Sequence, residues 1–248
     1  MFYRWKHDLP PFVELCPILL PGREARLSEP LCINSMHLME QIIRSLTMRI
    51  DRPYAIFGHS MGALLAFELA RSLRSHGLRE PDYLFLSGRN APQHRHEQQS
   101  IHHLPTDLLL AELHRRYGGL PHEILSDPQM LEIFLPILRA DLTLLETHRY
   151  REQLPLDCPV MAFAGVHDRN VSNEGLAAWS QLTTASFEAQ RFGGDHFYLS
   201  GEGRAPLLER ISETLAVVHR AALDELQSSV SEEDGRSRPT PPLPLGLR

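Results

Sequence analysis

The chain has 248 residues, of which 42% are hydrophobic and 23% are charged, as in an ordinary globular protein. This length fits one large α/β domain or two small ones, and the net charge of −6 argues against nucleic acid as the main partner. The three cysteines are too few and too widely spaced for a disulfide framework or a CxxC metal site. No apolar run has the length of a membrane span, and the first residues do not resemble a signal peptide, so we expect a cytoplasmic protein.

Apolar runs of strand length alternate with runs of helical spacing, which is typical of a mostly parallel sheet covered by helices. The predicted strands lie, in chain order, at residues 13–20, 54–57, 83–87, 160–165 and 187–192. The predicted helices of this core lie at 36–49, from Met61 onward, and at 207–226. The order of elements predicts an α/β fold.

Two stretches break the alternation. Residues 104–151 contain helical patterns without a clear strand, and an insertion of this kind between core strands usually forms a helical lid over an active site. These patterns lie at 107–117, 121–125 and 127–148, the last interrupted by Pro136. The acidic, proline-rich tail from Ser228 is too polar to pack and is predicted to be disordered. We therefore predict one domain over residues 1–227, with a lid at about 104–151, and a disordered tail at 228–248.

The pentapeptide Gly58-His59-Ser60-Met61-Gly62 joins a predicted strand to a predicted helix. G-x-S-x-G in this context is the nucleophile elbow of α/β-hydrolases. The tight turn requires very small residues two positions before and two positions after the serine. The helix that follows favours negative charge developing near its N-terminus. The pattern therefore predicts that Ser60 is a nucleophile.

A nucleophilic serine needs a base within hydrogen-bond reach, and the base needs a carboxylate that orients it. In α/β-hydrolases these groups follow in the order Ser, Asp or Glu, His, and such sheets build their sites at the carboxyl ends of strands. Asp168 comes just after the predicted strand at 160–165, and His196 follows the glycine loop after 187–192. We therefore predict that Asp168 is the orienting carboxylate and His196 the base.

Several neighbouring residues are alternatives for these roles. His167 is a competing base, whereas Asp195 is expected to face solvent and His59 to pack inside the elbow. A group that looks like a metal cluster consists of His94, His96, His102 and His103. No carboxylate or cysteine pattern accompanies these four histidines, so we predict no metal site.

With these residues in place, the chain resembles the type II thioesterases, the discrete editing enzymes of nonribosomal peptide and polyketide synthases. The resemblance covers residues 2–200, and the matching segments lie at 20–24, 57–63, 81–89, 138–141, 156–160 and 194–198. Leu-Pro-Gly-Arg at 20–23 together with Gly-His-Ser-Met-Gly at 58–62 is fairly specific among hydrolases. The resemblance implies an α/β-hydrolase fold, a mostly parallel sheet with helices on both faces and a helical lid.

The resemblance also implies hydrolysis of acyl thioesters on the phosphopantetheine arm of carrier proteins. Ser60 would attack the carbonyl, His196 would act as base, Asp168 would fix the imidazole, and the Met61 amide would contribute to the oxyanion hole. The arm belongs to the partner, so no cofactor of the protein's own is implied. The implied partners are acyl or peptidyl carrier domains, with neither nucleic acid nor membrane, and the protein would be a monomer. Candidate docking residues, or else ordinary surface arginines, are Arg89, Arg95, Arg115 and Arg116.

One departure from the family concerns the start of the chain. The family normally opens with a strand and a Phe-Pro-x-Ala-Gly-Gly-like loop that supplies one oxyanion-hole amide, whereas residues 2–10 here resemble the helix after that loop. We therefore expect the N-terminal strand or strands to be missing, through a misassigned start codon or a real truncation that reduces activity. The alternative functions are another serine esterase or acyltransferase of this fold, or a non-catalytic relative that binds carrier proteins.

Overall fold

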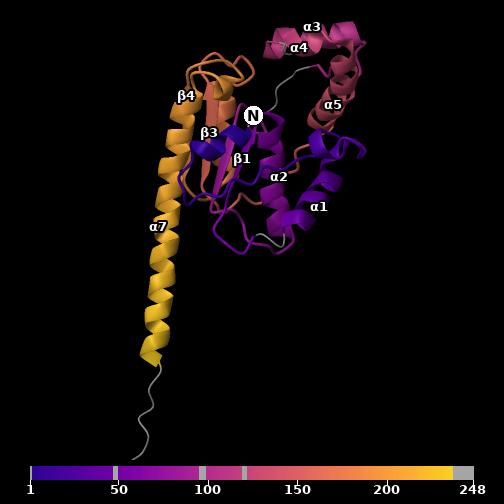
Figure 1. Ribbon diagram of the computed structural model, residues 1–248. Coiled ribbons are helices and arrows are strands. Elements are labelled where there is room, and N and C mark those ends of the chain that lie inside the picture. The colour runs from indigo at the N-terminus through magenta and orange to yellow at the C-terminus, as the bar shows by residue number, and fades with distance from the viewer. Residues whose placement is uncertain (1, 47–49, 95–98, 119–121, 237–248) are drawn as a thin grey trace, which may run out of the picture.

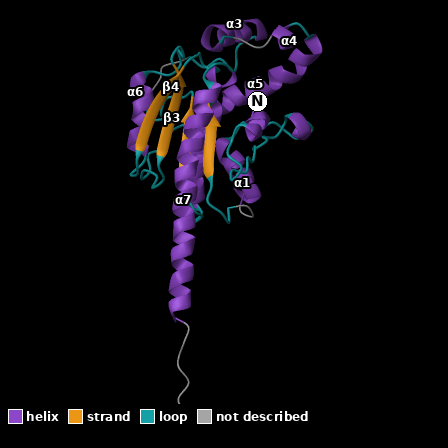
Figure 2. Cartoon of the chain, turned by 60° about the vertical axis from the view of Figure 1, so that its left-hand side comes forward, coloured by secondary structure: helices purple, strands orange, loops and turns teal. Residues whose placement is uncertain are grey.

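Four parallel strands form the central sheet, in the order β1-β2-β3-β4. They are β1 (Ala55–His59), β2 (Tyr83–Ser87), β3 (Val160–Gly165) and β4 (Phe187–Phe192). The computed structural model describes residues 2–46, 50–94, 99–118 and 122–236. In register, His59 lies beside Ser87, and Ser87 beside Phe163. The carboxyl ends of all four strands therefore meet at one edge of the sheet, the upper edge in Figure 2. The strands predicted at 54–57, 83–87, 160–165 and 187–192 are confirmed.

Helices cover both faces of this sheet (Figures 1 and 2). The α-helices are α1 (Ser35–Leu46), α2 (Met61–Ser75), α3 (Thr106–Tyr117), α4 (His122–Leu125), α5 (Pro128–Thr147), α6 (Asn173–Ala177) and α7 (Arg204–Arg236). Short 3₁₀ helices are η1 (Phe2–His7), η2 (Glu24–Arg26), η3 (Ala178–Leu182) and η4 (Tyr198–Ser200). In the described part of the chain, no helix is long and apolar enough to cross a membrane.

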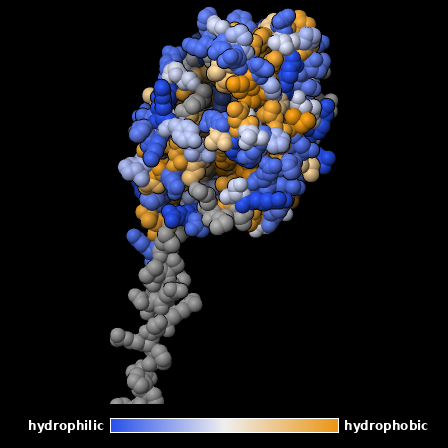
Figure 3. Space-filling model, turned by 45° about the vertical axis from the view of Figure 1, so that its right-hand side comes forward, coloured by the Kyte–Doolittle hydropathy of each residue, from blue (hydrophilic) through white to orange (hydrophobic). Residues whose placement is uncertain are grey.

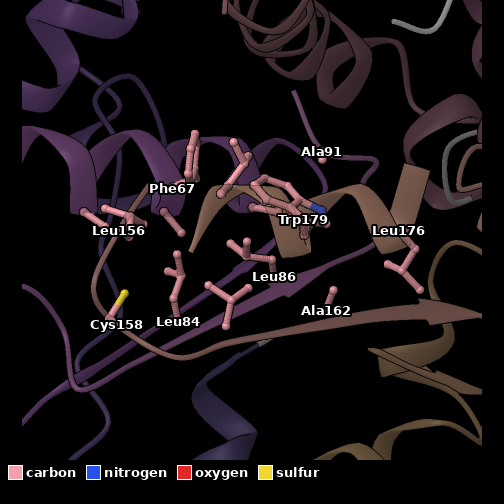
Figure 4. Close-up of a cluster of buried hydrophobic side chains, with 14 of the residues drawn as sticks. Phe67, Leu84, Leu86, Ala91, Leu156, Cys158, Ala162, Leu176 and Trp179 are labelled. Atoms are coloured by element: carbon pink, nitrogen blue, oxygen red, sulfur yellow. The ribbon is translucent and has the colours of Figure 1, made fainter. Parts of the chain in front are cut away.

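The alternation of side chains along β2 divides the core into two layers, because successive residues of a strand point to opposite faces. Leu84 and Leu86 pack with α2, α6 and η3, and Figure 4 shows them beneath Phe67 and Trp179. On the other face, Phe85 packs with η1 and the first turns of α7. Both faces of β2 are therefore buried, as its unbroken apolar run predicts.

The strand predicted at 13–20 is wrong, because this segment has no regular structure and does not join the sheet. An apolar run becomes a strand only where a neighbouring backbone accepts and donates its hydrogen bonds. Among the described residues, β1 pairs with β2 alone, and no ladder connects it to this segment. The segment instead lines a cavity of about 740 Å³, opposite Leu38 and Ile42 of α1.

Two predicted helix boundaries also differ from the structure. The helix predicted at 36–49 is present as α1, although residues 47–49 lie outside the described residues. Disorder predicted from Ser228 is wrong as far as Arg236, because α7 continues to that residue and far past the sheet (Figure 1). A helix propagates once it is started, and after Pro206 in the first turn of α7 the next proline is Pro239. The remainder of the predicted tail, 237–248, lies outside the described residues.

The insertion predicted as a lid contains the expected helices α3, α4 and α5. They lie beyond the upper edge of the sheet and along its side in Figure 1. The interruption predicted at Pro136 is wrong, because α5 runs through this residue without a break. Pro136 is exposed, so water can reach the helix carbonyl that loses its hydrogen bond to the missing amide proton.

Candidate active site

Ser60 stands in a sharp turn between β1 and α2. Its φ of +56° and ψ of −113° are unusual for a residue with a side chain, and such strain is typical of functional turns. The Ser60 amide donates a hydrogen bond of 2.7 Å to the Ser87 carbonyl of β2, which holds the turn against the sheet. The turn thus places the serine hydroxyl at the edge of the sheet where the strands have their carboxyl ends, as the elbow pattern predicts.

The two glycines of the elbow differ in how tightly they are enclosed. A Cβ atom added to Gly58 would lie 2.0 Å from the Gly62 carbonyl oxygen. A Cβ atom added to Gly62 would have no described atom within 4 Å. The predicted need for a very small residue is therefore confirmed before the serine and is wrong after it.

The predicted serine, histidine and aspartate meet at the carboxyl edge of the sheet. His196 Nε2 lies 3.0 Å from Ser60 Oγ, and His196 Nδ1 lies 2.8 Å from Asp168 Oδ2. The Asp168 side chain is 0% exposed, and that of His196 is 5% exposed. Because a carboxylate only accepts hydrogen bonds, Nδ1 carries the proton and Nε2 is free to accept the serine proton.

Hydrogen bonds between the β3 and β4 loops fix the distance between Asp168 and His196. The His167 amide donates to the Gly194 carbonyl at 2.9 Å. A Cβ atom on Gly165 would lie only 2.1 Å from the Asp195 carbonyl oxygen, so the two loops touch where β3 ends. Asp168 Oδ1 also accepts the Asn170 amide at 3.0 Å, which leaves both oxygens of the carboxylate bonded.

The competing candidates lie away from this arrangement. His167 is exposed, and the exposed Asp195 carboxylate accepts the Phe197 amide at 2.8 Å within its own turn. Of the four histidines considered for a metal, His102 bonds to Glu146 at 2.6 Å, and His96 lies outside the described residues. Within the described ranges, no group of three or more side chains could hold a metal ion.

Comparison with known proteins shows the family of this chain. The family model described as "Thioesterase domain" matches residues 1–215. The chain belongs to the thioesterase family. Among curated relatives, the gramicidin S biosynthesis protein GrsT of Aneurinibacillus migulanus is 39% identical over 217 residues, which are 88% of this chain and 84% of that protein. The recognition of the family from its sequence motifs is confirmed, and the protein is a hydrolase that acts on thioesters.

Two solved thioesterases share the fold. One is RedJ, from the prodiginine pathway of Streptomyces coelicolor, with a TM-score of 0.79 and 37% identity over 86% of this chain and 79% of that chain. The other is the type II thioesterase BorB from the borrelidin biosynthetic cluster, with a TM-score of 0.76 and 35% identity over 86% of this chain and 85% of that chain. These neighbours confirm the predicted α/β-hydrolase fold.

The helical insertion of this thioesterase reaches the histidine directly. The Tyr117 ring, at the end of α3, lies 5.1 Å from the His196 ring. Asn170, whose amide binds Asp168, donates through its side chain to the Arg116 carbonyl of α3 at 2.8 Å. Figure 3 shows a hollow with hydrophobic residues around it, below the part of the molecule that carries the lid.

A two-point ion pair connects α5 of the lid to the loop after residue 20. Arg23 Nη1 and Nη2 donate to the two carboxylate oxygens of Asp141 at 3.1 and 2.7 Å. The two residues come from the Leu-Pro-Gly-Arg and Leu-Arg-Ala-Asp segments that resemble the family. These two segments, far apart in sequence, are therefore joined by this ion pair.

Sequence reasoning missed a hydrogen-bonded chain behind the thioesterase site. Ser87 Oγ lies 2.9 Å from His59 Nδ1 and 2.7 Å from the Tyr198 hydroxyl. Burial, followed by the nearby His196, lowers the pKa of His59 to about 3. His59 is therefore a neutral packing group beneath the catalytic edge, as expected. A polar Ser87 at the end of a fully apolar strand was the signal available in the sequence.

Proposed function

We propose that this protein hydrolyses acyl groups from the phosphopantetheine arm of carrier-protein domains and so edits misprimed or stalled nonribosomal peptide or polyketide synthases. The observation that carries the proposal is the hydrogen-bonded series Ser60, His196 and Asp168 in a chain of the thioesterase family. Relatives named for gramicidin S, prodiginine and borrelidin biosynthesis support the setting.

In the proposed reaction, Ser60 attacks the thioester carbonyl while His196 Nε2 takes the hydroxyl proton. Asp168 stabilises the imidazolium that forms. His196 then protonates the departing thiol where it needs a proton. In the second half, His196 removes a proton from water, which attacks the acyl-serine and releases a free acid.

Met61 is the proposed oxyanion donor. It is the first residue of α2, so its amide has no carbonyl partner one turn earlier within the helix. The positive end of the helix dipole adds to the stabilisation of an oxyanion at this place. The Met61 amide therefore supports the charge that develops when Ser60 attacks.

We also propose that the protein works as a cytoplasmic monomer without a cofactor of its own. All three residues of the series come from one chain, so no second copy is needed to complete it. The phosphopantetheine arrives with the acyl group on the carrier protein.

The test is hydrolysis of acyl-loaded carrier protein, with product analysis and with a fluorophosphonate probe for the serine. We expect free acid without any added acceptor, probe labelling, and loss of both in Ser60→Ala but not in Ser45→Ala, which changes an exposed serine of α1. Release only with an added alcohol or amine would indicate an acyltransferase. Carrier binding without labelling or hydrolysis would indicate a binding protein instead.

A further inference from the structure

The backbone of Arg89 lies next to the active site. The preceding Gly88 has a φ of +66°, and a Cβ atom there would lie 2.5 Å from His59 Cε1 and 3.4 Å from His196 Cε1. The backbone at the end of β2 therefore touches the histidine rings. The buried Trp179 indole donates to the Arg89 carbonyl at 2.9 Å, which holds the Arg89 backbone in place.

The charge of Arg89 has no protein partner among the described residues. Its Nε is fully enclosed without a hydrogen bond, and no carboxylate of the described chain forms an ion pair with it. Other enclosed arginines are paired, since Arg71 binds Glu68 at 2.9 Å and Arg116 binds Glu112 at 3.0 Å. Because enclosed charges in proteins are normally paired, the free guanidinium of Arg89 is suited to an anion that arrives with the substrate.

Arg89 is surrounded by protein and yet partly accessible. Burial lowers the pKa of Arg89 to about 10, so the side chain remains charged at neutral pH. Tyr117, which lies near Arg89, is also partly accessible, and its ring lies 5.1 Å from the His196 ring. The Arg89 side chain is therefore crowded by protein but reachable by solvent, and its backbone follows directly after the glycine that contacts the histidine rings. The expectation that Arg89 docks a carrier protein stays a prediction.

We propose that Arg89 is a carboxylate-binding subsite that favours short acyl groups ending in a carboxylate, of the malonyl type. In the proposed function above, on which this inference rests, the thioester carbonyl lies at Ser60. A malonyl carboxylate is only a few bonds from that carbonyl. The phosphate of the carrier arm lies at the opposite end of the arm from the thioester. A planar guanidinium also matches a carboxylate with two parallel hydrogen bonds.

The test compares malonyl and butyryl thioesters of N-acetylcysteamine, which carry no phosphate. The measured quantity is the malonyl-to-butyryl ratio of kcat/KM in the native protein, Arg89→Gln and Arg89→Lys. We expect Arg89→Gln to lower this ratio by roughly 10- to 100-fold, the range that corresponds to a hydrogen bond to a charged group. The ratio for Arg89→Lys should lie between those of the native protein and Arg89→Gln. Lysine keeps the positive charge but cannot form the two parallel hydrogen bonds of a guanidinium. Arg44→Gln, which changes an exposed arginine of α1, should keep the native ratio.

Circular dichroism and the rate of fluorophosphonate labelling show whether each variant is folded with its serine intact. An unchanged ratio in folded Arg89→Gln would overturn the subsite, while loss of turnover in Ser60→Ala would leave the proposed function standing. Arg89→Gln could instead lower kcat/KM equally for malonyl and butyryl thioesters, and only when coenzyme A carries the acyl group. In that case the arginine binds phosphate and the subsite is wrong. Failure of the native protein to hydrolyse any thioester would overturn both proposals.

Discussion

Replacing Gly58 by alanine should destroy the elbow, whereas the same change at Gly62 should be tolerated. The new Cβ atom at Gly58 would lie 2.0 Å from the Gly62 carbonyl oxygen and 2.7 Å from the Ala63 nitrogen. Both neighbours are backbone atoms of α2, so no side-chain rotation relieves the overlap. Overpacking of this kind costs about 1–3 kcal/mol or more. A displacement of about 1 Å at Ser60 would lower the rate about 100-fold in addition.

Gly62→Ala is the matched control, since its Cβ atom meets open space among the described residues. Glycine within a helix is less stable than alanine by roughly 0.5–1 kcal/mol, so this variant should be as stable as the native protein or slightly more stable. Thermal unfolding and fluorophosphonate labelling measure the two effects. Native stability and labelling in Gly58→Ala would refute the reasoning, as would equal damage in the two variants.

Three further predictions concern the charges around the site. Asp168→Asn should lower thioester hydrolysis about 10⁴-fold, because the amide no longer holds the required imidazole tautomer, whereas Asp195→Asn should leave steady-state turnover unchanged. His59 has a folded pKa of about 3, below the unfolded value of about 6.5. Its contribution to stability is therefore present above pH 6.5 and is lost as pH falls toward 3, by at most about 1.4 kcal/mol per pH unit. Asp141→Asn should break the pair with Arg23, lower the free energy of unfolding by about 1 kcal/mol, and raise hydrogen exchange in α5.

The controls for these predictions use the same assays. Equal rates for Asp168→Asn and Asp195→Asn would contradict the assignment of the carboxylate. Denaturant titrations of His59→Gln between pH 7 and pH 4 should show a shallower loss of stability than the native protein. An identical slope would show that other groups cause the acid sensitivity. Unchanged hydrogen exchange in Asp141→Asn would mean that the ion pair does not hold the lid.

Local patterns were sufficient to predict the catalytic edge of the sheet. Runs such as 83–86 and 160–165 are apolar throughout and end at polar or turn residues, so their burial and their ends follow from the sequence alone. Because parallel strands bring their carboxyl ends together, the order of Ser60, Asp168 and His196 then predicts that they meet. The structure brings these three side chains within hydrogen-bond distance.

What the sequence could not provide depends on contacts between distant segments. The run at 13–20 has strand composition, but a strand also needs a neighbour, and composition does not show whether one is present. The bond between Ser87 and Tyr198 joins residues 111 positions apart. Likewise, the unpaired state of Arg89 is visible only when the surroundings of its side chain are known.

Asn170 joins the loop that carries the catalytic carboxylate to the helical insertion. Its amide binds the Asp168 carboxylate, and its side chain binds the last turn of α3. Any outward swing of that turn must stretch or break the second bond and so loosens the loop that aims the carboxylate at His196. Asn170 therefore links the position of α3 to the orientation of the carboxylate in the series Ser60, His196 and Asp168.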